Sequence, residues 1–429
     1  MRYISTRGGI LEPITFSESI VEGLAPDQGL IIPESYPQYS IDDLESMRDM
    51  GFPELSFNLL GDLADDIPSN DLETIIKKVY TKERFGTKDI TPLTELFPET
   101  YLLDLANGPT LAFKDIALQL LTTLLEYTLE KNESYLNVLL ASSGDTISSA
   151  IEASIGKSRL AVIGLTPFEK MSLLQAAQAY SVIEPNIHNL AVRTVFDGCQ
   201  DIVKAVNKDE EFKEEYHIGA LNSINWGRVA AQIVYYFKAY FAATSKPGEE
   251  VDFAVPTGNF GDILAGYIAK KMGLPIRNLI LATNENDVLD IFYKTGLYKV
   301  REKEDVIKTS SFSMDIAKAS NFERWLYDLV GQNPETVRAY MTLVNNAGGF
   351  NLAGTDFYDE IGKSGIVSGR SLHQDRMNTI KYVYDETKLV IDTHTADGFK
   401  VGQEYKEKGV KLICISTAKP TKFEEYIAE

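Results

Sequence analysis

Lys114 has surroundings that favour covalent chemistry. It follows Phe113 and begins an apolar run that contains Ile116, Ala117, Leu120 and Leu121. Apolar surroundings remove water from an ammonium group, which lowers its pKa and favours the neutral amine. The neutral amine is the form that makes a Schiff base with a carbonyl compound. Taken alone, the segment favours a surface lysine that starts an amphipathic helix, because most lysines are exposed; the rest of the chain reverses this judgement.

Two strand-to-helix junctions are rich in glycine and hydroxyl groups, a composition suited to anions. One consists of Gly258, Asn259, Phe260, Gly261 and Asp262, and the other contains Ser143, Gly144, Asp145 and Thr146. Backbone N–H groups at a helix N-terminus bind anions, and glycine lets an anion approach closely. The first junction lacks the Gly-Lys-Ser/Thr ending of a Walker loop. As bare patterns both are weak, since the first also fits an ordinary turn and the second a simple helix cap.

Arg228 is the candidate for recognising a phosphoryl group. A guanidinium can bind phosphate through two parallel hydrogen bonds, so Arg228 together with Asn225 predicts a phosphate contact. The alternative is an exposed arginine at the start of a helix.

The composition excludes several classes of partner. The formal net charge of −20 disfavours nucleic acid and anionic membranes, which require basic surfaces. Cys199 and Cys414 lie far apart and the four histidines form no cluster, so we expect free thiols and no metal site. No apolar run reaches the about 18 residues that span a bilayer, and the first residues lack the apolar core of a signal peptide. These features predict a cytoplasmic protein.

The order of elements predicts an α/β protein. At 429 residues, the chain should contain about two or three domains. Residues 1–90 are expected to be mostly helical, with a capping box at Thr15–Glu18, a helix stop at Gly23 and a helical stripe over 71–80. From residue 135 onward, apolar strands alternate with helices, which predicts parallel sheets covered on both faces. The expected strands are 137–141, 160–165, 189–193, 251–256, 279–283, 388–391 and 411–415, and the polar stretch 344–378 is expected to be a mobile loop or an insertion.

Several motifs resemble those of threonine synthases and occur in the same order. The segment Gly108-Pro-Thr-Leu-Ala-Phe-Lys-Asp115 is similar to the one around the lysine that binds pyridoxal phosphate in that family. Gly258 to Asp262 resembles the loop that cradles the cofactor phosphate in fold-type II pyridoxal phosphate enzymes. Further similar segments are Ser143 to Thr146, Lys170-Met-Ser172 with Gln175, Asn222 to Arg228, Asp392 to Ala396 and Ser416 to Pro420. One short motif would be weak evidence, but these matches cover nearly the whole chain.

The resemblance implies a role for each candidate residue. Lys114 would be the catalytic residue and hold pyridoxal 5'-phosphate, and Thr417 would hydrogen-bond the pyridine nitrogen. The other cofactor-binding residues would be Gly258, Asn259, Phe260, Gly261 and Asp262. The substrate-binding residues would be Ser143, Gly144, Asp145, Thr146, Lys170, Ser172, Asn225 and Arg228. His394 would line the pocket or be a plain loop histidine, and no metal is implied.

The resemblance also implies a fold and a reaction. The fold is the fold-type II α/β architecture, similar to the tryptophan synthase β subunit, with an N-terminal mostly helical domain (1–90), a large α/β cofactor domain (91–134 and 235–429) and a small α/β domain (135–234). The reaction converts O-phospho-L-homoserine and water to L-threonine and phosphate, in a monomer or homodimer without nucleic-acid or membrane partners. The alternatives are a related β- or γ-replacement or elimination on another phosphorylated amino acid, and a catalytically silent homologue.

Some positions near the expected pocket depart from the family's pattern. Asn107 and Lys419 stand where the family has histidine, and the other departures are Ala106, Ile147, Thr166, Glu169, Leu173 and Asp397. They predict either compensated drift within ordinary threonine synthases, to which we give more weight, or a slow enzyme or one retuned to a related substrate.

Overall fold

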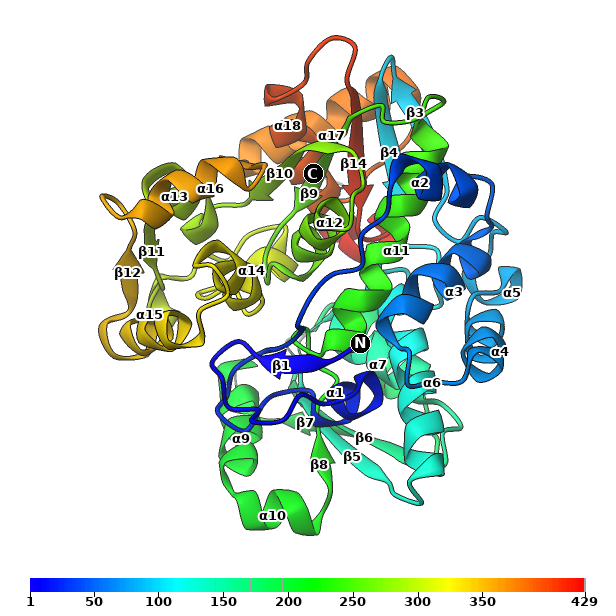
Figure 1. Cartoon of the computed structure of the whole chain (residues 1–429), viewed down its shortest axis with the longest axis vertical. Helices are drawn as coiled ribbons and strands as arrows, with labels where there is room; N and C mark the ends of the chain where they lie inside the picture. Colours follow the sequence, from blue (N-terminus) through cyan, green and yellow to red (C-terminus); the bar gives the residue numbers. More distant parts are fainter. Residues whose placement is uncertain (143, 170, 195, 428–429) are drawn as a thin grey trace.

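The computed structural model describes residues 1–142, 144–169, 171–194 and 196–427, and its site is built on two sheets. The larger sheet has six strands, ordered β13 (Ile366–Arg370), β10 (Ile276–Thr283), β9 (Val251–Pro256), β14 (Lys411–Ser416), β4 (Thr100–Asp104) and β3 (Leu93–Phe97). The smaller has four, ordered β7 (Ile187–Val192), β6 (Leu160–Pro167), β5 (Leu136–Ala141) and β8 (Ile218–Gly219). In Figure 1 the smaller sheet lies below the larger one. The strand pairs are parallel, as predicted, except for the antiparallel pair β3–β4.

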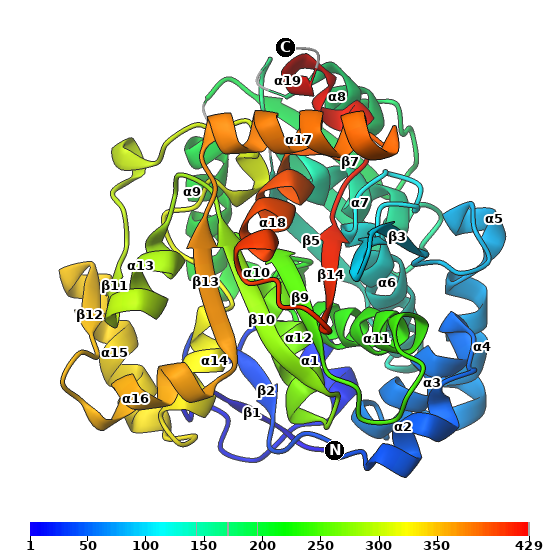
Figure 2. The same ribbon diagram turned by 90° about the horizontal axis from the view of Figure 1, so that it is seen from above.

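Successive side chains along the strands of the larger sheet pack alternately into two hydrophobic clusters. In β9, Phe253 and Val255 belong to the main core, whereas Ala254 belongs to a second cluster. Successive side chains of a strand point to opposite faces, so the sheet is covered on both sides. Figure 2 shows α17 (His373–Thr387) and α18 (Thr393–Glu404) over the near face. On the other face, α11 (Trp226–Ala243) brings Tyr236 against Phe253.

Further helices connect the strands and complete the layers. They are α6 (Lys114–Lys131), α7 (Asp145–Ser154), α8 (Leu173–Tyr180), α9 (Phe196–Lys208), α10 (Glu210–Glu215), α12 (Gly261–Lys271), α13 (Val288–Thr295), α14 (Phe322–Leu329), α15 (Pro334–Ala347), α16 (Asp356–Lys363) and α19 (Glu424–Ile427). Short 3-10 turns occur at η1 (Lys303–Asp305), η2 (Phe312–Met314) and η3 (Pro420–Phe423), and β11 (Leu297–Lys299) pairs with β12 (Gly349–Asn351). In the described ranges, no helix is both long and apolar enough to cross a membrane.

The N-terminal residues form helices joined to a small antiparallel pair of strands, β1 (Tyr3–Ser5) and β2 (Ile31–Pro33). The capping box at Thr15–Glu18 and the left-handed helix stop at Gly23 are both present. The predicted stripe over 71–80 forms the buried face of α4 (Ser69–Val79). The remaining helices of this region are α1 (Phe16–Glu22), α2 (Ile41–Met47), α3 (Phe52–Leu63) and α5 (Lys82–Phe85).

Two predictions about the C-terminal third are wrong. Residues 388–391 form no strand but connect α17 to α18, and Leu389 and Val390 in this apolar run are each 38% exposed. The outer strand is instead β13, within the stretch 344–378 that was expected to be a loop. Ser368 and Gly369 interrupt the apolar run of this strand, so a prediction based on apolar runs does not find it. Glycine is needed because a Cβ at 369 would lie 2.6 Å from Val401 Cγ1.

The strands of the larger sheet come from residues 93–104 and 251–416, and those of the smaller from 136–219. The division of the chain into three domains stays a prediction.

Replacing Gly266 with alanine is expected to destabilise the protein, although alanine is favoured in helices by about 1 kcal/mol. The added Cβ would lie 2.6 Å from Tyr236 Cε1 and 2.8 Å from Leu279 Cδ2. Such overpacking costs about 1–3 kcal/mol, which urea unfolding would measure. The matched control is Gly61→Ala in α3, where no atom lies within 4 Å of the added Cβ. Equal stabilities of the two variants would contradict the close packing of α11 and α12.

Candidate active site

A cavity of about 430 Å³ collects side chains from both sheets. Its walls include the residues that follow β5, β9 and β14, so it lies at the carboxyl ends of parallel strands, where ligands bind in α/β proteins. The predicted residues that line it are Lys114, Asp145, Thr146, Arg228, Gly258, Asn259, Phe260, Gly261, Asp262, His394 and Thr417. The fold therefore brings most of the predicted site together.

Other predicted residues do not reach the cavity. Asn225 caps α11: its side chain accepts a hydrogen bond from the Gly227 N–H at 3.0 Å and donates to Ile20 O at 2.8 Å. Ser172 caps α8, and Gly144 precedes α7 without lining the cavity. Ser143 and Lys170 lie outside the described residues. The substrate-binding roles of these residues stay predictions.

Lys114 begins α6 at the cavity wall, with its side chain 15% exposed. Its Nζ lies 3.8 Å from Asp145 Oδ2 and 4.9 Å from the centre of the Phe113 ring. Burial lowers the pKa of Lys114, and the Asp145 carboxylate opposes that shift. The predicted apolar surroundings are thus present, and they favour a nucleophilic amine.

The loop before Lys114 is fixed by its own residues. The backbone N–H and the hydroxyl of Thr110 both donate to the Asp115 carboxylate at 2.7 Å. Gly108 has no side chain because a Cβ there would lie 2.4 Å from Asp115 Cβ. The Phe113 N–H donates to Thr417 O at 2.8 Å, which joins the lysine loop to the segment that follows β14. Lys114 and Thr417 therefore face one cavity.

The glycine loop Gly258 to Gly261 connects β9 to α12 along the cavity wall. The first N–H groups of a helix have no acceptor within it, so they are available to an anion. A Cβ at Gly258 would lie 3.0 Å from Met314 Cα and 3.2 Å from Ser313 O. Phe260 has a left-handed φ of 67° and is buried, with its ring packed against Phe322. The loop is consequently shaped by close backbone contacts and by an anchored aromatic ring.

Asp262 follows this loop and carries a perturbed carboxyl group. Tyr235 and Tyr236 donate hydrogen bonds to its Oδ1 at 2.6 and 2.8 Å. Burial nevertheless raises the pKa of Asp262 to about 6. In the part of the chain that is described, Oδ2 is buried without a hydrogen-bond partner. One acceptor at the cavity wall is therefore left for a ligand or a proton.

Arg228 is a buried cation, not an exposed residue at a helix start. It is 3% exposed, and its one hydrogen bond in the described structure runs to Leu221 O at 3.4 Å. Its Nε is buried without a partner among the described residues. Burial lowers the pKa of Arg228 to about 10, so it stays charged at neutral pH. An underused guanidinium on a cavity wall is suited to an anionic ligand.

His394 holds a segment over the glycine loop. Its Nδ1 lies 3.1 Å from Asp392 Oδ1, and its Nε2 accepts the Ser313 N–H at 3.1 Å. This pattern indicates the neutral tautomer with the proton on Nδ1. His394 therefore lines the cavity and fixes Ser313, whose carbonyl closes over Gly258.

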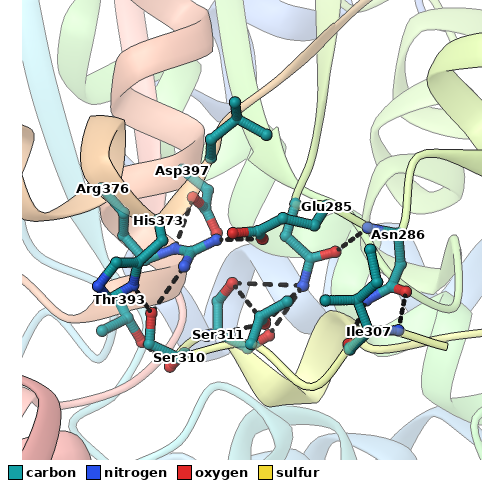
Figure 3. A network of polar contacts seen from close by, with 12 residues as sticks. Glu285, Asn286, Ile307, Ser310, Ser311, His373, Arg376, Thr393 and Asp397 are labelled. Atoms are coloured by element: carbon teal, nitrogen blue, oxygen red, sulfur yellow. Dashed lines mark hydrogen bonds and ion pairs between the residues drawn. The ribbon is translucent and has the colours of Figure 1, made fainter.

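A buried ionic network holds the segment 310–314, which contains Ser313 (Figure 3). Arg376 contacts Asp397 at 2.9 Å, Glu285 at 2.8 Å and the Ser310 hydroxyl at 2.6 Å. Thr393 donates to Ser310 O at 2.9 Å. The segment that contributes Ser313 to the cavity is thus tied to α17, α18 and the end of β10.

The sequence analysis missed Lys422 near the reactive lysine. Lys422 is buried, and its Nζ lies 2.9 Å from Asp145 Oδ1. Lys422 follows the Ser416–Pro420 motif by two residues, and this proximity is the one feature of the sequence that could have placed it near the site. Ser313, Met314 and Gln232 also line the cavity and were not predicted, because no motif marks them.

None of the departures from the family's pattern lines the cavity in the described structure. Asn107 and Lys419 contact each other, with Lys419 Nζ 3.0 Å from Asn107 Oδ1 and 2.5 Å from Asp104 Oδ2. Ile147 fills the space beside Gly164, and Thr166 is hydrogen-bonded to Tyr180 at 2.5 Å. These residues pack around the site without forming its walls.

Comparison with known proteins identifies close relatives over the full chain. A family model described as the threonine synthase N terminus matches residues 2–80. A threonine synthase of Methylobacillus glycogenes is 50% identical and one of Corynebacterium glutamicum 46% identical, with 100% of this chain and 92% and 90% of those chains covered. The crystal structure of a threonine synthase from Brucella melitensis with bound pyridoxal phosphate superposes with a TM-score of 0.95, at 37% identity, over 100% of this chain and 90% of that one.

Gly258→Ala is expected to weaken binding of pyridoxal phosphate, because the added Cβ displaces the glycine loop or the segment at Met314. We expect a loss of affinity of at least about tenfold, or about 1.4 kcal/mol, in a cofactor titration followed by absorbance. Gly362→Ala is the control, since no atom lies within 4 Å of its added Cβ. Equal affinities of the two variants would mean that Gly258 is not needed for close approach of the phosphate.

Proposed function

Because this chain belongs to the threonine synthase family, we propose that its cavity converts O-phospho-L-homoserine and water to L-threonine and phosphate with pyridoxal 5'-phosphate. The chain is accordingly a pyridoxal phosphate-dependent lyase with the fold of the type II enzymes. The observation that carries the proposal is the convergence of a buried amine (Lys114), a glycine loop at a helix start and an underused guanidinium (Arg228) on one cavity. These are the groups required for a carbonyl cofactor with a phosphate arm and for a phosphorylated substrate.

The residues present fit the cofactor. Gly258 to Gly261 would hold its phosphate through backbone N–H groups, with Asn259, Phe260 and Asp262 shaping that loop. The Thr417 hydroxyl would hydrogen-bond the ring nitrogen, and Lys114 would form the covalent link. When bound, the cofactor supplies an electron sink for the carbanion at the substrate Cα. The cavity volume of about 430 Å³ is within the range of about 300–1,000 Å³ that is typical of such sites.

The remaining work falls to side chains of this chain. Lys114 would move protons among Cα, Cβ and Cγ of the substrate. Arg228 would hold the phosphoryl group that leaves from Cγ, before water adds at Cβ. Thr146 and the start of α7 would bind the substrate carboxylate, together with Ser143, Gly144 and the backbone N–H of Asp145. Lys170, Ser172 and Asn225 are proposed as further phosphate-binding residues, although Ser172 and Asn225 cap helices outside the cavity lining.

The wider organisation follows from the same proposal. The segments 1–90, 91–134 with 235–429, and 135–234 would act as three domains, with the cavity between the two α/β parts. We infer a cytoplasmic protein that is a monomer or homodimer. Its partner would be the phosphorylated amino acid, without nucleic acid or membrane.

The proposal is tested by trapping the cofactor and identifying the product. Borohydride reduction of the cofactor-loaded protein followed by peptide mapping should place the pyridoxyl group on Lys114. Incubation with phosphohomoserine should yield threonine and phosphate, and Lys114→Ala should lose both the adduct and the product. An adduct on Lys170, Lys419 or Lys422, or a product other than threonine, would overturn the assignment.

Arg228→Ala is expected to weaken binding of the phosphorylated substrate and of inorganic phosphate as an inhibitor. Loss of a charge-assisted hydrogen bond costs about 1.5–3 kcal/mol, which is about 10- to 150-fold in KM. The visible absorbance of the bound cofactor should be unchanged, because Arg228 is assigned to the substrate. Arg228→Lys keeps the charge without the planar fork and should give an intermediate effect. Unchanged kinetics in both variants would make Arg228 a structural residue.

A further inference from the structure

Lys422 is a buried lysine that shares one carboxylate with Lys114. Its side chain is fully buried, and its Nζ lies 2.9 Å from Asp145 Oδ1, 2.7 Å from Thr110 O and 3.0 Å from Gln178 Oε1. An ammonium group has three N–H donors, and each of these acceptors can take one. A neutral amine would turn its lone pair toward one of these oxygen acceptors, so the geometry favours the charged form.

Asp145 therefore faces two amines at unequal distances. The Lys422 ammonium is in hydrogen-bonding contact with Oδ1, whereas Lys114 Nζ is 3.8 Å from Oδ2. Gln175 also donates to Oδ1 at 3.1 Å. Although burial opposes ionisation, the two lysines lower the pKa of Asp145 to about 2. The carboxylate is thus charged, and its closest cation is Lys422.

The other charged groups around Lys114 do not supply a second close counterion. Arg228 and Lys422 are cations that add to the effect of burial, and both lower the pKa of Lys114. The Asp115 carboxylate raises that pKa, but it already accepts hydrogen bonds from Thr110 and Ser149. Asp262 interacts with Lys114, yet burial raises the pKa of this carboxyl to about 6 and two tyrosines occupy its Oδ1. Asp145 is consequently the carboxylate that decides how well the Lys114 ammonium is stabilised.

We propose that Lys422 is a positioning residue that occupies Asp145 as its own counterion, so that Lys114 is held as a neutral amine ready for covalent chemistry. The inference deepens the proposed function, on which it rests through the role of Lys114. Without the Lys422 charge, Asp145 would pair with Lys114 and stabilise its ammonium form. The 3-10 turn η3 would then support the active site, because its Lys422 contacts Asp145, which lines the cavity.

The state of each lysine can be read in the full chain without cofactor. Trace labelling with an acetylating reagent across a range of pH, followed by peptide mass spectrometry, gives the midpoint at which each amine becomes reactive. In the unmodified protein we expect Lys114 to become reactive at a lower pH than the exposed lysines of the same chain. A Lys114 midpoint at or above that of the exposed lysines would overturn the proposal, and this comparison requires no variant to fold.

Lys422→Met should shift the midpoint of Lys114 upward by about one pH unit or more, which is about a tenfold loss of neutral amine below the midpoint. The double variant Lys422→Met/Asp145→Asn removes both charges and should return the midpoint of Lys114 to the original value or lower. A purely structural role of Lys422 would not produce this rescue. Lys157→Met, which removes another largely buried lysine outside the cavity lining, is the matched control and should leave Lys114 unchanged.

Two outcomes would contradict the proposal in the variants. One is an unchanged midpoint of Lys114 in Lys422→Met, and the other is a shift that persists in the double variant. Both readouts are independent of the reaction, since no cofactor or substrate is present. A borohydride adduct on another lysine would refute the proposed function while leaving this titration measurable, so the two failures can be distinguished.

Discussion

The proposed chemistry depends on the charges around Lys114, whose ion-pair partner Asp145 is in closer contact with Lys422. The whole chain has a formal net charge of −20, which would favour protonated lysines throughout. At the cavity, Arg228 and Lys422 act on Lys114 as neighbouring cations, and Lys422 contacts the Asp145 carboxylate directly. Burial makes each charge costly, so the amine without its own close counterion is the one that gives up its proton. The arrangement would favour a nucleophilic amine, and Arg228 on the same cavity is proposed to bind the phosphoryl group.

The parallel sheets place these groups together, and that part could be predicted. Strands 137–141, 251–256 and 411–415 are apolar on both faces, and residues that follow β5, β9 and β14 line the cavity. Lys422 could not be predicted, because its three acceptors belong to α7, α8 and the loop before Lys114 and meet only after folding. β13 was not predicted because it contains Gly369, which interrupts its apolar run. A glycine is required there because the Val401 side chain packs closely against it, and such a tertiary contact cannot be seen in the sequence. Local pattern thus predicted loops that line one cavity, but not the buried side chains that contact them.

The departures from the family's pattern are explained better by compensation than by a new substrate. Asn107 and Lys419, two positions where the family has histidine, form a hydrogen bond with each other and contact Asp104. Substitutions that meet in space can preserve a local structure even when each alone would disturb it. None of the departing residues lines the cavity in the described ranges, whereas the lysine, the glycine loop and the guanidinium do. Together with 50% identity to a threonine synthase over the full chain, this does not favour the alternative reactions.

Asp397, another departure from the family's pattern, stabilises the structure around the site through its ion pair with Arg376. Arg376 and Asp397 are fully buried, and Arg376 also contacts Glu285, so one guanidinium serves two carboxylates. Burial raises the pKa of Asp397 to about 6, and the Arg376 guanidinium opposes that shift. Removal of one partner from such a pair typically costs about 3–5 kcal/mol, because the other charge is left uncompensated. The same arginine holds Ser310, and the segment that follows presses Met314 against Gly258. Buried charges more than 100 residues further along the chain therefore hold the segment that packs against the glycine loop.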